Sequence, residues 1–81
     1  MKISTSTLDA IAESREELEW SAVTVNFTRR GKIEAAVNKS QLYSIGHSEA
    51  VEELDQLYTD HSRDSVLDWL ENHFEEHDYA E

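Results

Sequence analysis

The residues with the most suggestive spacing for chemistry are two histidines near the C-terminus. His73, Glu76 and His77 match the H-x-x-E-H pattern of a class of zinc metallopeptidases. On a helix, two histidines four residues apart can share a metal ion. However, Phe74 belongs to the apolar stripe of the predicted helix, and the sequence marks no third ligand. We therefore expect neither a metal site nor a catalytic site here.

Other catalytic chemistries lack the residues that they usually need. The chain contains no cysteine and only two glycines. Thiolate nucleophiles, thiolate zinc sites and glycine-rich phosphate loops are therefore excluded by composition. No serine stands in the glycine-flanked turn that exposes a nucleophile. We expect a non-catalytic protein that uses no cofactor.

Carboxylates form the most regular polar pattern. In the last predicted helix they recur at spacings of 4, 3, 4 and 3 and so share one face, which we call the C-terminal acidic stripe: Asp64, Asp68, Glu71, Glu75 and Asp78. The preceding helix adds Glu49, Glu52 and Glu53. Residues 41–81 carry twelve acidic side chains and one basic side chain, Arg63, so salt bridges within these helices are nearly absent.

This charge pattern indicates a docking surface. Residues 1–40 are balanced, with six acidic and six basic side chains, so the net charge of −11 comes from the second half. Such a charge disfavours direct contact with nucleic acid or an anionic membrane and favours a partner protein with a basic groove. In size and charge the chain is similar to small acidic phage and mobile-element proteins that inhibit restriction or CRISPR systems. We expect an inhibitor or regulator that imitates nucleic acid on a partner's basic surface.

The alternative is a regulatory subunit that binds through apolar edges while its acidity serves only solubility. An accessory or antitoxin-like subunit of this kind would use exposed aromatic anchors. The candidates are Trp20, Tyr43, Trp69 and Tyr79. A secondary basic site is also predicted at Arg29, Arg30 and Lys32, where three cations could contact a phosphate or simply protect a strand edge.

The elements that would position these residues begin with a helix over residues 7–19, with Ser6 as its cap. The pattern then alternates with period two over residues 23–28 and 33–38, which predicts an antiparallel β-hairpin. A three-residue loop would put the apolar residues of both strands on one face and place Gly31 at a left-handed position. Residues 41–45 are either a loop or a third strand that completes a meander.

Two further helices complete the predicted fold, over residues 49–59 and 63–77, with Ser48 and Ser62 as caps. Their inward-facing stripes are Val51, Leu54, Leu57 and Tyr58, and then Val66, Leu67, Leu70 and Phe74. The prediction is a single α+β domain over residues 1–81, with both helices packed on one face of the sheet. So small a sheet favours a homodimer. The lack of cysteine and of an apolar signal segment favours the cytoplasm.

Overall fold

The computed structural model describes residues 1–76, and of Glu75 and Glu76 only the backbone. Within this range the chain is built from helices alone and contains no strand. In chain order, the elements are α1 (Thr5–Trp20), α2 (Arg29–Ala36), α3 (Lys39–Ser44), α4 (Ser48–Asp60) and α5 (Arg63–Glu76). None of these helices is long and apolar enough to cross a membrane.

The predicted hairpin is wrong, because its second strand is helix α2. The Thr28 side chain caps this helix by accepting a hydrogen bond from the Gly31 amide at 3.0 Å. The buried residues that follow are Ile33, Ala36 and Val37. They lie at i, i+3 and i+4, which is the spacing of a helical stripe rather than of a strand. Gly31 therefore lies in the first turn of a helix and has no positive φ.

The first predicted strand is also wrong, because residues 21–26 form turns after α1. The Val23 amide donates to the Leu18 carbonyl at 3.1 Å, and the Ala22 amide donates to Glu19, also at 3.1 Å. The bond from Val23 to Leu18 closes the helix in the manner of a Schellman motif. Ala22 occupies the left-handed position of this motif with φ 61°, where glycine is the usual residue. The helix end was therefore hidden from sequence reasoning.

Residues 41–45 are not a strand either, because α3 covers most of them. The Asn38 side chain caps this short helix by accepting from the Gln41 amide at 3.2 Å. The prediction of an α+β meander is thus replaced by an all-helical fold for residues 1–76. Since this part of the chain has no sheet, sheet extension no longer provides a reason to expect a homodimer.

The predicted first helix and the two predicted C-terminal helices are confirmed as α1, α4 and α5. Two of their predicted caps are wrong: Ser4 caps α1 instead of Ser6, and α4 begins after His47 without a side-chain cap. Ser62 does accept a hydrogen bond from the Ser65 amide at the start of α5. The buried stripes of α4 and α5 are those that the sequence predicted, except that Tyr58 is only partly buried against the core.

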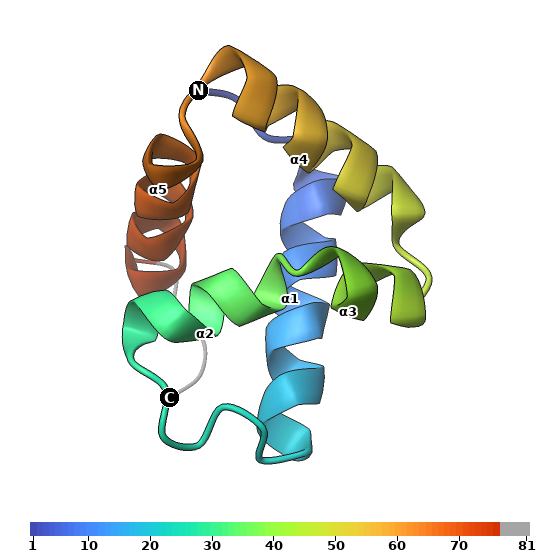
Figure 1. The fold of residues 1–81 in the computed structure, drawn as a ribbon, viewed down its shortest axis with the longest axis vertical. Helices are drawn as coiled ribbons and strands as arrows, with labels where there is room; N and C mark the ends of the chain where they lie inside the picture. The colour runs from blue at the N-terminus through green and yellow to red at the C-terminus, as the bar shows by residue number, and fades with distance from the viewer. Residues whose placement is uncertain (77–81) are drawn as a thin grey trace.

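Four helices contribute most of the core, and α3 adds Leu42. α1 packs against α2, α3 and α4, while α5 packs against α2 and α4 (Figure 1). The two C-terminal helices thus rest on helices rather than on a sheet. The largest fully buried side chains come from every helix: Ile11, Ile33, Leu42, Val51, Val66, Leu67 and Leu70.

Candidate functional site

The C-terminal acidic stripe is partly neutralised by a cation from α2. Arg30 donates from Nε to Glu71 Oε1 at 2.9 Å and from its guanidinium to Asp68. These carboxylates lie 41 and 38 residues further along the chain, so the pairing is purely tertiary. Of the other stripe residues, Asp64 is exposed, while the Glu75 side chain and all of Asp78 lie outside the described part. The stripe is therefore less available for docking than its spacing suggested.

Glu53, predicted as part of the docking face, instead fastens the N-terminal segment to α4. It accepts hydrogen bonds from the Ser4 amide at 2.8 Å, the Ser4 hydroxyl at 2.6 Å and the Thr7 hydroxyl at 2.6 Å. Burial raises the pKa of Glu53, but the hydrogen bonds from Ser4 and Thr7 outweigh it and leave the pKa below its ordinary value. Glu49 and Glu52 remain exposed on the same helix.

The acids of α4 and α5 do not continue one another. The two helices diverge from the turn that joins them, so their axes run in different directions (Figure 1). A single strip of carboxylates along both helices, as an imitation of a phosphate backbone would need, is therefore not formed.

The predicted basic site lies in the first turn of α2 rather than at a hairpin tip. Arg30 is engaged by the acids of α5, and Lys32 Nζ lies 4.0 Å from Glu19 Oε2 on α1. Arg29 is exposed. Arg30 and Lys32 thus link α2 to α5 and α1.

The histidine pattern does not come together as a site within the described residues. The His73 ring stacks on Trp69, with centroids 5.2 Å apart and planes 7° apart, and meets the edge of Phe74. No group of three or more metal-binding side chains occurs in the part of the chain that is described. His77 lies outside it.

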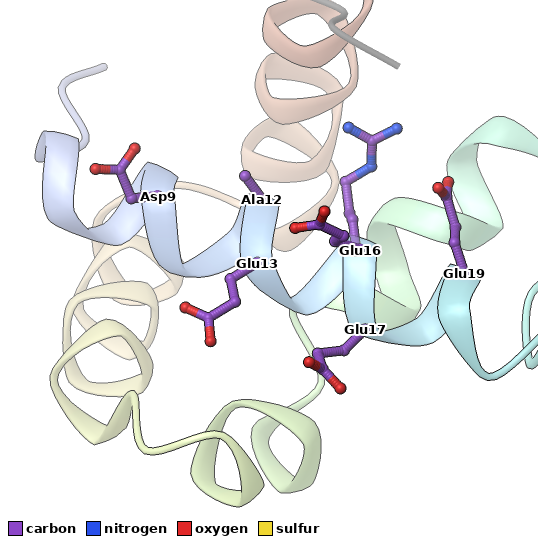
Figure 2. A pocket seen from close by; sticks show the side chains of 7 residues that line it. Asp9, Ala12, Glu13, Glu16, Glu17 and Glu19 are labelled. Atoms are coloured by element: carbon purple, nitrogen blue, oxygen red, sulfur yellow. The ribbon is translucent and has the colours of Figure 1, made fainter. Parts of the chain in front are cut away.

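Sequence reasoning missed an acidic groove along α1. Its lining includes Asp9, Glu13, Glu16 and Glu17, whose side chains project from successive turns of the helix (Figure 2). Glu13 Oε1 lies 2.8 Å from His47 Nε2, whereas no ion pair joins Asp9, Glu16 or Glu17 to any residue within 1–76. The spacing of residues 9, 13 and 16 is visible in the sequence. Because the net charge of −11 comes from residues 41–81, the acidic site was predicted on the two C-terminal helices instead.

The second feature that was missed is a run of exposed apolar side chains, which we call the apolar segment (residues 20–27). Trp20 is 82% exposed, Val23 54%, Val25 73% and Phe27 46%. The hairpin prediction had buried the last three on a sheet face, so their exposure overturns it. Only Thr24 turns inward and is buried. Not one charged residue occurs between positions 20 and 28, in a chain that is 31% charged.

Of the other predicted aromatic anchors, Tyr43 is exposed and Trp69 is half-buried, while Tyr79 lies outside the described residues. No protein-family model, curated protein or solved structure matches this chain.

Proposed function

We propose that this protein is a non-catalytic binding module that docks on a partner protein through the apolar segment. The observation that carries the proposal is the exposure of four large apolar side chains within eight consecutive residues. They present on the order of 400 Å² of apolar surface, at the level where patches on soluble proteins are commonly functional. This corresponds to the regulatory or accessory subunit that was the alternative prediction.

Trp20 is the expected anchor of the interface. It is the most exposed of the four side chains, and tryptophan is strongly enriched among residues that dominate binding energy. Its burial in a partner's pocket typically contributes at least about 2 kcal/mol, with the neighbouring valines and Phe27 excluding water around it. A segment without charged side chains can enter such a pocket without the desolvation penalty of a buried charge.

The segment is also held in place by the fold. The bond that closes α1 at Val23, the buried Thr24 and the Thr28 cap of α2 fix it at three points. The loss of conformational entropy on binding is therefore smaller than for a free peptide, which favours affinity.

Docking of acidic helices on a basic, nucleic-acid-binding surface is the second candidate function. Glu49, Glu52 and Asp64 favour it, since they are exposed and form no ion pair within residues 1–76. The pairing of Asp68 and Glu71 with Arg30 weighs against it. We rank it below the apolar segment for that reason.

Affinity capture from the native host, quantified by mass spectrometry, tests both candidates. The bait is the full chain as wild type, as the apolar-segment variant Trp20→Ala/Val25→Ser, and as the acid-neutralised variant Glu49→Gln/Glu52→Gln/Asp64→Asn. We expect Trp20→Ala/Val25→Ser to lose the partner and Glu49→Gln/Glu52→Gln/Asp64→Asn to retain it. Loss with the charge variant alone would favour acidic docking, and circular dichroism confirms that each bait is folded.

A further inference from the structure

We infer that the partner's binding site is an apolar pocket bordered on one side by lysine or arginine side chains. This inference rests on the proposed function and adds the chemistry of the partner. It follows from the position of Trp20 at the end of an acidic face of α1, which we call the α1 acidic stripe: Asp9, Glu13 and Glu16.

Helical geometry places Trp20 on the same face as the α1 acidic stripe. The residues follow one another at spacings of 4, 3 and 4, so each lies about one turn after the last. The distance along the helix from Asp9 to Trp20 is roughly 16 Å at about 1.5 Å per residue. Glu16 and Trp20 are neighbours at i and i+4, with roughly 5–6 Å between their Cβ atoms.

Little of the charge of this face is compensated from within residues 1–76: Arg15 is the one basic side chain that lines the same groove, and it forms no ion pair with these carboxylates. Asp9, Glu16 and Glu17 are exposed and have no ion pair among residues 1–76, and Glu13 meets only the imidazole of His47. Figure 2 shows the carboxylates spread along the helix rather than folded back on one another. A partner that covers Trp20 therefore also comes close to an open row of carboxylates.

The other end of the apolar segment differs in charge. It leads into α2, where Arg29 is exposed and Arg30 is turned towards α5. Within residues 1–76, the unpaired carboxylates next to the apolar segment therefore lie on its Trp20 side, and the complementary cations should border the part of the pocket that accepts Trp20. Such an arrangement fixes the orientation of docking as well as its location.

The same charges argue against other occupants. A second copy of this chain would bring a further net charge of −11 to the interface, and nucleic acid or an anionic membrane would bring phosphates to the carboxylates. A basic, partly apolar protein surface is the one class that satisfies both features. Its association should be accelerated by charge at low ionic strength, while its lifetime depends on the apolar contacts.

Designed peptides provide a direct test with the full-length chain. The probes are three fluorescent helical peptides of equal length. The first has a stripe of leucines bordered by lysines, the second has the same stripe bordered by glutamates, and the third keeps the lysines but has serines in place of the leucines. Binding is followed by fluorescence anisotropy at about 0.05 and 0.5 M NaCl, a range across which the screening length falls several-fold.

We expect the leucine–lysine peptide to bind with a dissociation constant at least tenfold lower than that of either other peptide. Glu16→Gln/Glu17→Gln should weaken its binding about three- to tenfold at low salt and have little effect at high salt. Glu49→Gln/Glu52→Gln removes the same charge from α4 and should change affinity less than twofold. Trp20→Ala should weaken binding at least tenfold at both salt concentrations.

The contrary outcomes separate the inference from the proposed function. Equal binding of the two leucine peptides would overturn the basic border and leave docking through the apolar segment intact. Tight binding of the lysine–serine peptide, or no effect of Trp20→Ala, would overturn both. A homodimer detected by light scattering and abolished by Trp20→Ala would identify a second copy as the occupant and overturn the inference.

Discussion

Replacing Arg30 with alanine should remove the main polar link between α2 and α5. The guanidinium reaches Glu71 through Nε and Asp68 through Nη2, and no other cation contacts these carboxylates within residues 1–76. Without it, Asp68 and Glu71 are left as like charges at i and i+3 on one helix. The variant therefore loses two charge-assisted hydrogen bonds and exposes a repulsion.

The magnitude follows from how far the three side chains are exposed. Arg30 is 33% exposed, Glu71 25% and Asp68 61%. Pairs at the surface contribute about 0–1 kcal/mol, and hydrogen bonds to charged groups contribute about 1.5–3 kcal/mol. We expect Arg30→Ala to lower the free energy of unfolding by about 1–2 kcal/mol, most of it from the Glu71 contact. For a domain of this size, Tm should fall by roughly 5–10 °C.

Urea and thermal unfolding followed by circular dichroism, at about 0.05 and 0.5 M NaCl, would measure the effect. Lys39→Ala is the matched control, because Lys39 Nζ lies 3.3 Å from Asp55 but the pair is 61% and 48% exposed. It should cost less than about 0.5 kcal/mol. The deficit of Arg30→Ala should shrink at high salt. Equal stability of the two variants at low salt would refute the reasoning.

Four further substitutions test the backbone at three positions and the contact that Glu53 makes with the N-terminal segment. Ala22→Gly should raise the free energy of unfolding by about 0.5–1 kcal/mol, because Ala22 has φ 61°, and Gly46→Ala should lower it by about 1 kcal/mol, because Gly46 has φ 86°. Gly31→Ala should change the free energy of unfolding by less than about 0.5 kcal/mol. The higher helix propensity of alanine offsets the close approach of its Cβ to Thr28 Oγ1, at 3.2 Å. A loss above about 1 kcal/mol would contradict the placement of Gly31 in the first turn of α2. Glu53→Gln should lower the free energy of unfolding at pH 7, because the pKa of Glu53 in the folded protein lies below its ordinary value of 4.5. The stabilisation by the Glu53 carboxylate is complete above the unfolded-state pKa and is lost as the pH falls through the folded-state pKa. Denaturant midpoints measured between about pH 3 and pH 7 should therefore converge at the acidic end, and a pH-independent difference would contradict the assignment.

The sequence was sufficient to predict the helices with long, regular apolar stripes. In α4 and α5 a buried apolar residue recurs every three or four positions along the whole helix, so tertiary context had little to override. The prediction for residues 23–37 failed because short apolar runs fit both the strand period of two residues and the helical period of about 3.6 residues. Ile33 and Val37 belong to a strand pattern with Ala35 and to a helical pattern with Ala36, and burial selected the second.

The candidate site could be predicted only in part. The positions of Glu16 and Trp20 on one helical face follow from spacing, and the alternative prediction had already singled out Trp20 as an anchor. The exposure of Val23 and Val25 did not follow, since it depends on α1 ending at Trp20, with Ala22 rather than a glycine in the left-handed position that follows. The neutralisation of Asp68 by Arg30 depends on how α2 packs against α5, which no local pattern encodes.

The central claim is that the protein recognises its partner through the apolar segment around Trp20. The most direct measurement is the dissociation constant of the captured partner for wild type and for Trp20→Ala, determined with both purified proteins at about 0.15 M NaCl. We expect the variant to bind at least tenfold more weakly while its unfolding midpoint is unchanged, because Trp20 is exposed and contributes little to the core. Dissociation constants within twofold of each other would contradict the claim.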